Sequence, residues 1–390
     1  MTSKKIAVLF WLIFLLVLTG CWKVNDDNKD SYSDNKIDSW SIVKPSVDKI
    51  TKVKLTKSNE CIDNLTIEWA NYLNKIWYKN YSNKEWCNLK ELDLRTSQLK
   101  TLPKEIWYLT SLTELKLSYN ELTTLPKEIW NLTNLTLLDL KVNYLQNLPK
   151  EIWNLTNLTE LKLQQNKFQT LPNEILNLSN LKFLSLSNNQ LRVLPKEIWN
   201  LTNITVLGLS NNKLSALPEE IWNLTNLIHL FLNSNQLVTL PKEIWNLTNL
   251  TEFDLSKNKL IALPEEIWNL TNLIHLFLNS NQLVTLPNEI WNLISLTEFN
   301  LSNNKLIALP KEVGVLYKLK SINLSNNNLR TLPNEIWNIT MLKDLYLEKN
   351  IWLSPLDNNY HYSSRLDLTK WNIRIKYNED AHKVDIIFID

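Results

Sequence analysis

The chain is short of glycine and cysteine, and each shortage excludes a class of site. It has 3 glycines in 390 residues, where average usage would give roughly 27. A glycine-rich phosphate-binding loop is therefore excluded, because it needs several glycines within a few residues. The 3 cysteines, Cys21, Cys61 and Cys87, are too far apart in sequence to form a paired zinc-ligand motif, so we expect no metal site.

A large excess of either charge is also missing. The 42 basic and 40 acidic residues give a net charge of +2, so the basic surface of a nucleic-acid-binding protein is not expected. The 4 histidines do not follow a catalytic-triad pattern. We therefore predict a protein that is not an enzyme, with no catalytic residue, no cofactor and no nucleic-acid partner.

The N-terminus has the pattern of an export signal. Lys4 and Lys5 precede an apolar run from Ile6 to Leu18, which is too short to span a bilayer comfortably. The next residues, Thr19-Gly20-Cys21, complete a motif that resembles the lipobox of bacterial lipoproteins. That resemblance implies that residues 1–20 are a lipoprotein signal peptide and that Cys21 is lipidated. The alternative is an ordinary signal peptide with an incidental cysteine.

This resemblance places the protein outside the cytoplasm, lipid-anchored at the cell membrane or cell surface. Residues 21–57 are rich in Asn, Asp, Ser and Lys, so we predict a flexible tether. Residues 58–88 are expected to form an N-terminal helical cap, with a helix at about 62–77. Cys61 and Cys87 flank that helix, and we interpret them as a disulfide in an oxidising compartment. Two buried free thiols are the alternative.

From Leu89 the chain repeats every 23 residues, and eleven units run to Met341 without an insertion. The unit that begins at Leu112 reads LTELKLSYNELTTLPKEIWNLTN. We number its residues as positions 1 to 23. Positions 3 to 7 alternate polar and apolar residues, which predicts a short strand with one buried face. One such strand cannot bury its leucines alone, so neighbouring units must stack.

This unit resembles the leucine-rich-repeat family, with the pattern LxxLxLxxNxLxxLPxEIxxLxx. The resemblance covers residues 89–350 and implies an α/β solenoid of about 12 repeats, shaped as a horseshoe with a concave parallel β-sheet. Residues 351–390 depart from the pattern. We predict a C-terminal cap there, with strands at about 371–377 and 384–389.

Three framework positions of the repeat have a physical explanation. Asn at position 9, as in Asn120, offers both donors and an acceptor to backbone groups that turn into the interior. Pro126, at position 15, suits the first position of a short helical turn, and Glu128 then lies near the positive end of that turn.

Position 19 is unusual, because the family commonly has glycine there and this chain has tryptophan in most units. Gly314 keeps the family residue, and Leu176 is the other exception. A glycine would suit a positive φ at the end of a helical turn, whereas tryptophan would not. One interpretation is that the natural protein has glycine here, since different bacteria read the codon UGA as glycine or as tryptophan. The alternative is a real stack of tryptophans on the convex side.

The outward positions 3, 5 and 7 of the strands are expected to line the concave face. The early units carry mixed charges there, whereas the middle units carry aromatic side chains rimmed by acids. Such a patch is typical of a binding surface. The predicted partner-binding residues are Phe183, Val206, His229, Phe231, Glu252, Asp254, His275, Phe277 and Glu298.

Tandem duplication is the competing explanation of this pattern. Residues 219–263 and 265–309 have nearly the same sequence, so His229 and His275 are copies of one residue and not two independent observations. Neighbouring aromatic side chains can also simply pack along a sheet. The predicted function is a monomeric, membrane-anchored module that binds a protein or glycan on its concave face. The alternative is a structural envelope lipoprotein that assembles laterally.

Overall fold

The computed structural model describes residues 82–351 apart from residue 103, together with residues 373–378 and 383–388. The helix predicted at 62–77, the tether, Cys21 and Cys61 lie outside these residues. The described chain begins with helix α4, Asn83–Cys87. Ser82 and Glu85 form a capping box at its start, a Ser-x-x-Glu signal that the sequence analysis did not use.

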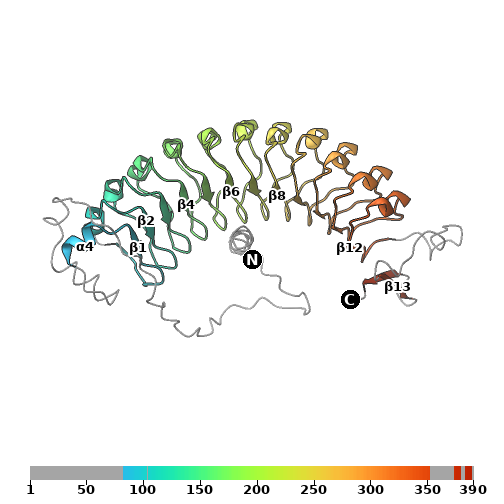
Figure 1. The fold of residues 1–390 in the computed structure, drawn as a ribbon, viewed down its shortest axis with the longest axis horizontal. Coiled ribbons are helices and arrows are strands. Elements are labelled where there is room, and N and C mark those ends of the chain that lie inside the picture. The colour runs from blue at the N-terminus through green and yellow to red at the C-terminus, as the bar shows by residue number, and fades with distance from the viewer. Residues whose placement is uncertain (1–81, 103, 352–372, 379–382, 389–390) are drawn as a thin grey trace, which may run out of the picture.

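Twelve short strands follow and pair in chain order, each parallel to the next, in one open sheet. In Figure 1 the strands lie on the inner side of an arc and the helical turns lie on its outer side, which confirms the predicted horseshoe. The strands are β1 Glu91–Asp93, β2 Glu114–Lys116, β3 Leu137–Asp139, β4 Glu160–Lys162, β5 Phe183–Ser185, β6 Val206–Gly208, β7 His229–Phe231, β8 Glu252–Asp254, β9 His275–Phe277, β10 Glu298–Asn300, β11 Ser321–Asn323 and β12 Asp344–Tyr346.

Each coil returns on the convex side through a five-residue 3₁₀ helix. These are η1 Lys104–Tyr108, η2 Lys127–Asn131, η3 Lys150–Asn154, η4 Asn173–Asn177, η5 Lys196–Asn200, η6 Glu219–Asn223, η7 Lys242–Asn246, η8 Glu265–Asn269, η9 Asn288–Asn292, η10 Lys311–Val315 and η11 Asn334–Asn338. Pro126 is the N-cap of η2, with φ −67° and ψ 150°, and so lies one residue before the first helical residue and not at that residue as predicted. Its fixed φ suits the extended conformation of the cap as well. Glu128 lies in the first turn, as expected.

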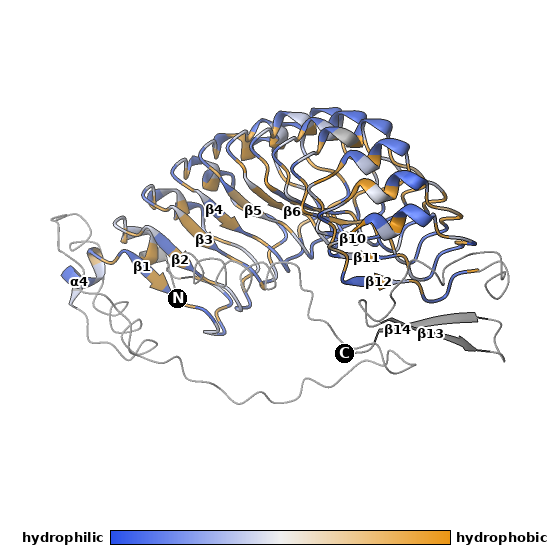
Figure 2. Cartoon of the chain, turned by 45° about the vertical axis from the view of Figure 1, so that its right-hand side comes forward, coloured by the Kyte–Doolittle hydropathy of each residue, from blue (hydrophilic) through white to orange (hydrophobic). Residues whose placement is uncertain are grey.

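The sheet and the helical turns enclose a continuous spine of leucine and isoleucine. Leu115, Leu117 and Ile129 are fully buried, and the same positions are buried in the following units. Burying one such side chain stabilises a fold by about 1.5–3 kcal/mol. Figure 2 shows hydrophobic residues along the strands and hydrophilic residues on much of the outer turns. The spine is therefore shared between coils, as the repeat pattern predicted.

The position-9 asparagines connect each coil to its neighbours, which confirms their structural role. The amide of Asn143 donates to the carbonyls of Leu117 and Leu140 at 3.0 and 3.1 Å. Its oxygen accepts from the backbone N–H of Leu122 at 3.0 Å. The same three contacts recur from Asn120 to Asn350. Each asparagine thus satisfies buried backbone groups of two coils, which would otherwise cost about 1–3 kcal/mol each.

Side chains at position 7, which strand alternation predicts to point outward, are buried in most units. Ser118, just after the strand that ends at position 5, is fully buried. The next residue, position 8, takes a left-handed φ of 51–58° in the twelve units from Thr96 to Lys349. None of these residues is glycine, and Val142 is a β-branched example. Position 8, and not position 19, is where the backbone would favour glycine.

The tryptophans at position 19 fall into two groups. Trp107, Trp153, Trp199, Trp245 and Trp291 are at most 1% exposed, whereas Trp130 and Trp222 are 46% and 45% exposed. No tryptophan here has a positive φ, so the conformational argument for glycine is wrong. The buried tryptophans occupy alternate units of the described chain, Trp337 is partly buried, and Trp245 and Trp291 contact Phe253 and Phe299 edge to face.

Hydrogen bonding and space nevertheless favour glycine. Within the described residues, the buried indole N–H groups of these five tryptophans and of Trp337 have no hydrogen-bond partner. Buried tryptophans usually find one. A Cβ added at Gly314 would lie 2.4 Å from the carbonyl oxygen of Glu335, so only glycine fits there.

We therefore predict that tryptic peptides of the natural protein from its own cells have glycine wherever position 19 is tryptophan in this sequence. Peptide sequencing by mass spectrometry checks this. Tryptophan at Trp153 and Trp199 in that material would contradict the codon interpretation and establish the tryptophan stack.

The C-terminal strands are β13, Ile373–Asn378, and β14, Lys383–Phe388, which pair antiparallel. They match the predicted strands within two residues. Their predicted role as a cap on the last repeat stays a prediction, because residues 352–372 lie outside the described chain.

Candidate functional site: the concave face

Strand positions 3 and 5 form two rows of side chains along the concave face. The parallel pairing aligns each position with the same position of the next strand, so that His229, Glu252 and His275 are neighbours in one row. Phe231, Asp254 and Phe277 are neighbours in the other. Residues 23 apart in sequence therefore act as adjacent residues of one surface.

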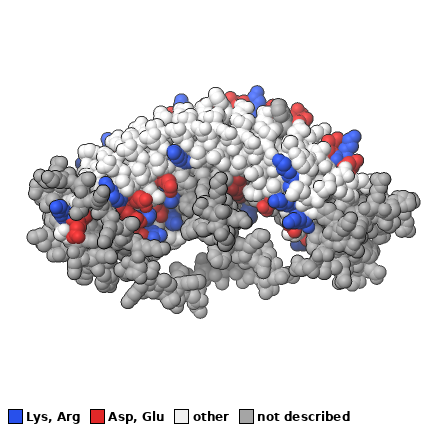
Figure 3. Space-filling model, in the orientation of Figure 1, with Lys and Arg blue, Asp and Glu red and all other residues white. Residues whose placement is uncertain are grey.

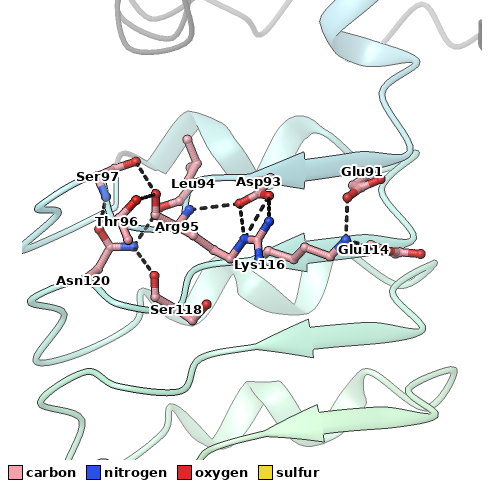
Figure 4. Close-up of polar contacts among 10 residues, drawn as sticks. All are labelled: Glu91, Asp93, Leu94, Arg95, Thr96, Ser97, Glu114, Lys116, Ser118 and Asn120. Atoms are coloured by element: carbon pink, nitrogen blue, oxygen red, sulfur yellow. Dashed lines mark hydrogen bonds and ion pairs between the residues drawn. The ribbon is translucent and has the colours of Figure 1, made fainter. Parts of the chain in front are cut away.

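On β1 to β4, acidic and basic side chains of this surface form ion pairs with one another. Arg95 pairs with Asp93 at 2.6 Å, and Lys116 pairs with Glu91 and, at 3.0 Å, with Glu114. Figure 4 shows these ion pairs along the first two strands. Burial opposes ionisation of Asp93, but hydrogen bonds from Arg95 bring the pKa of this carboxyl below its usual value.

Lys162 pairs with Glu160 at 3.0 Å on β4 in the same manner. In Figure 3 acidic and basic side chains lie side by side at the end of the solenoid that holds these strands. The early units thus present a mixed but balanced surface, as the sequence predicted.

The middle strands present an apolar surface. Phe183, Val206 and Phe231, on β5 to β7, form a hydrophobic cluster that is separate from the main core. They are 7%, 7% and 2% exposed. Gly208 lies beside them, and a Cβ there would approach the hydroxyl oxygens of Ser187 and Ser185 at 3.1 and 3.3 Å. The structure therefore brings together three of the predicted partner-binding residues.

The next predicted residues form a two-walled arrangement on β7, β8 and β9. The rings of His229 and Phe231 lie side by side, with centroids 6.4 Å apart and planes 3° apart. His275 and Phe277 repeat this pair with centroids 6.4 Å apart. Between the two pairs lies β8, which carries Glu252 and Asp254. We call these six residues the β7–β9 slot. Glu298, the last predicted residue, is exposed on β10 beside it.

Polar contacts within the slot hold its floor in place. Nδ1 of His229 lies 3.2 Å from Oε2 of Glu252. Asp254 is 7% exposed, and its Oδ1 accepts a hydrogen bond from the N–H of Ser256 at 2.9 Å. Burial raises the pKa of Asp254 to about 6, and the hydrogen bonds from Ser256 offset only part of that effect. The sequence analysis found Asp254, but could not predict its burial.

A groove runs along one rim of the sheet and has a volume of about 830 Å³. It is lined mainly by residues at positions 2 and 23, which include Asn203, Thr205 and Asn226. The amide of Asn203 donates to the carbonyl of Ser179 at 2.8 Å, and the hydroxyl of Thr205 donates to that of Lys182 at 3.2 Å. These side chains form a second ladder that the sequence analysis missed, although Thr-Asn recurs before most position-1 residues. Because their donors already bind backbone, the rim is framework.

The remaining predictions concern a disulfide, metals and the membrane. Cys87 is disulfide-bonded, but Cys61 lies outside the described residues, so their pairing stays a prediction. Within the described ranges, no cluster of three or more side chains suits a metal ion. No helix in that part of the chain is long and apolar enough to cross a bilayer.

The pKa of Asp254 predicts a pH dependence of stability. The native carboxyl holds its proton up to a pH of about 6, whereas the unfolded carboxyl releases it near 3.8. The free energy of unfolding therefore falls as pH rises through this window. We expect Asp254→Asn to raise the free energy of unfolding by up to about 3 kcal/mol at neutral pH. At a pH of about 3.5 the substitution should have little effect, because the native carboxyl is then already protonated. Urea unfolding at both pH values measures this difference.

Asp139 supplies the control, because it occupies the same strand position on β3 and likewise accepts from the N–H two residues later. It interacts favourably with Arg95, so Asp139→Asn should not stabilise the protein. Equal effects of the two substitutions at neutral pH would show that burial of Asp254 has no special cost.

Comparison with known proteins identifies the repeat. The family model described as leucine rich repeat matches residues 87–145, 134–191 and 294–350, and two related models match residues 165–239 and 249–270. No curated protein matches the chain.

Solved structures agree with the family models. A leucine-rich-repeat protein of Leptospira interrogans is 38% identical, with a TM-score of 0.62. The match covers 70% of this chain and 82% of that one. The ectodomain of the receptor kinase GASSHO1/SCHENGEN3 of Arabidopsis thaliana was solved in complex with CASPARIAN STRIP INTEGRITY FACTOR 2. It is 31% identical, with a TM-score of 0.58, over 69% of this chain and 37% of that one.

An internalin of Listeria monocytogenes shares the fold. It is 23% identical, with a TM-score of 0.59, over 74% of this chain and 90% of that one.

Proposed function

Since the chain belongs to the leucine-rich-repeat family, we propose that it is a non-enzymatic, lipid-anchored module that binds a protein partner on its concave face. The observation that supports this most is the change along that face. The charges of β1 to β4 are paired among themselves, whereas β5 to β9 present aromatic rings and carboxylates. Desolvated aromatic clusters of this kind supply most of the binding energy in protein interfaces.

The framework supports the same assignment. The asparagine ladder and the leucine spine use the polar and apolar residues that every unit shares. Strand positions 3 and 5 are free of that role, and they are the positions that vary between units. The related Arabidopsis ectodomain was solved in complex with CASPARIAN STRIP INTEGRITY FACTOR 2, which supports a binding role for the same face here.

The predicted lipobox supports attachment to a membrane. Buried acyl chains contribute about 0.8 kcal/mol for each methylene, and more than one chain gives stable attachment. Residues 21–57 would then hold the solenoid at the cell surface on a tether.

Fractionation of the producing cells tests the anchor. We expect the unchanged protein in the membrane fraction and the Cys21→Ser variant in the soluble or secreted fraction, since the serine cannot form the thioether to lipid. A Cys61→Ser variant is the control for loss of a cysteine, and it should stay with the membrane. Retention of Cys21→Ser in the membrane at the unchanged level would contradict lipid anchoring.

Alanine at Phe231 and Phe277 tests the binding face. The full chain should capture one partner reproducibly from envelope extracts, and the double variant should lose about tenfold or more of that affinity. Val238→Ala with Val284→Ala is the matched control, because these residues belong to the same two units and are 42% and 44% exposed. Binding measured by surface plasmon resonance, with thermal unfolding alongside, separates lost contact from lost fold.

Capture that survives the Phe231 and Phe277 changes would contradict a concave binding site. If those variants also self-associated as the unchanged protein does, lateral assembly of a structural lipoprotein would replace the proposal. The partly exposed Trp130 and Trp222 on the convex side would then be the surface to change next.

A further inference from the structure

The rows of positions 3 and 5 carry acids but no lysine or arginine where the concave face becomes aromatic. The outward positions 3 and 5 of β7 to β10 include Glu252, Asp254 and Glu298, but no lysine or arginine. The basic side chains in these rows are two histidines. Lys257 is the cation that acts on Asp254, from the turn after β8. A partner that supplies a positive charge would complete this surface, whereas an anionic partner would be repelled.

The β7–β9 slot has the dimensions of a site for one side chain. Strands in a sheet lie about 4.8 Å apart, so the His–Phe walls on β7 and β9 stand on backbones about 9.6 Å apart. Atoms in van der Waals contact are separated by about 3.5–4.0 Å. A lysine or arginine side chain that entered above β8 would therefore come close to the rings on both sides. The floor beneath it is Glu252 and Asp254.

The walls and the floor favour the same chemistry. The face of a phenyl ring attracts a cation, and a carboxylate with little exposure to water gains most from a counter-ion that replaces its solvent. A neutral apolar group would cover the carboxylates without compensating their charge. The chain already uses this contact nearby, because the ammonium of Lys162 lies 5.6 Å from the ring centroid of Phe183. Among the described residues, no lysine or arginine lies over Phe231 or Phe277 in this way.

The duplicated segment shows that the carboxylate in the floor is not required by the fold. Asn300 occupies the position of Asp254 in the second copy. Its Oδ1 accepts from the N–H of Ser302 at 3.1 Å, as Asp254 accepts from Ser256 at 2.9 Å. The neutral amide thus makes the same turn contact. The first copy keeps a charge in a buried place where an isosteric neutral residue would fold, which is typical of residues kept for function.

We infer that the β7–β9 slot binds the cationic side chain of a lysine or arginine on the partner polypeptide. The side chain lies between the two His–Phe walls, and its charge meets Asp254 and Glu252. This inference rests on the proposed function and specifies the partner chemistry at one place on the concave face.

Short peptides test the slot without the natural partner. The probes are acetyl-Gly-Gly-X-Gly-Gly-amide with lysine, arginine or norleucine at X, titrated against the full chain in a non-ionic detergent and followed by saturation-transfer NMR. We expect the lysine and arginine peptides to bind about tenfold more tightly than the norleucine peptide. Asp254→Asn should weaken lysine binding about tenfold, and Phe277→Leu, which keeps an apolar side chain but removes the aromatic ring, should weaken it about threefold.

Asp139→Asn is again the control and should leave the affinity unchanged, because Asp139 does not lie between aromatic walls. Equal binding of the lysine and norleucine peptides, or equal effects of the Asp254 and Asp139 substitutions, would overturn the inference. Failure of the peptides while Phe231→Ala with Phe277→Ala still abolishes partner capture would reject the cation slot and leave the proposed function intact. Peptide binding without any partner capture would support the cation slot and contradict the proposed function.

Discussion

From the second repeat onward, each coil depends on a buried asparagine side chain that bonds to the backbone of its own coil and of the coil before it. Asn143 donates to Leu117 in one coil and to Leu140 in its own. The turn that leaves the sheet would otherwise bury carbonyl and amide groups without partners, and such groups are costly. Because the bond spans neighbouring coils, it fixes their spacing as well as satisfying their backbone. The leucine spine can form only where that spacing is kept.

This constraint determines where function can reside. Positions 1, 4, 6 and 9 are committed to the interior, and positions 2 and 23 bond to the rim backbone through side chains such as Thr205 and Asn203. Position 3 carries no such framework bond between coils, and at position 5 an acid or amide bonds only within its own coil, to the N–H two residues later, as Asp254 does to Ser256. A change at these positions alters the concave face without disturbing the solenoid. Duplication of a 46-residue pair of units therefore copies a surface pattern, and single changes such as Asp254 against Asn300 can then differentiate the copies.

The two halves of the concave face illustrate different uses of charge. Lys116 lies among Glu91 and Glu114, and such partly exposed pairs contribute little to stability because water screens them. Asp254 instead lies in a dry environment without a paired lysine or arginine, and burial raises its pKa. A buried carboxylate of this kind lowers the stability of the free protein. It also increases the binding free energy that a positively charged partner can gain.

The sequence by itself determined the repeat, the strand, the buried asparagine and the parallel register, because each follows from a 23-residue period and from the need to bury leucines. It also identified the residues of the concave patch, since strand alternation decides which side chains point outward. Alternation did not predict that Ser118 is fully buried, because position 7 lies beyond the end of the three-residue strand. Alternation also did not predict the left-handed backbone conformation at position 8, which follows the end of each strand.

Only the tertiary structure decided which carboxylate is buried, which acids are paired, and which tryptophans lie inside. These properties depend on neighbours 23 residues away and on how closely adjacent coils approach. Asp254 and Asp139 occupy the same position in two different units. The strands beside Asp254 carry aromatic residues at that position, whereas those beside Asp139 carry lysines. A local pattern does not specify that difference, because the environment of each side chain is completed by the adjacent coil.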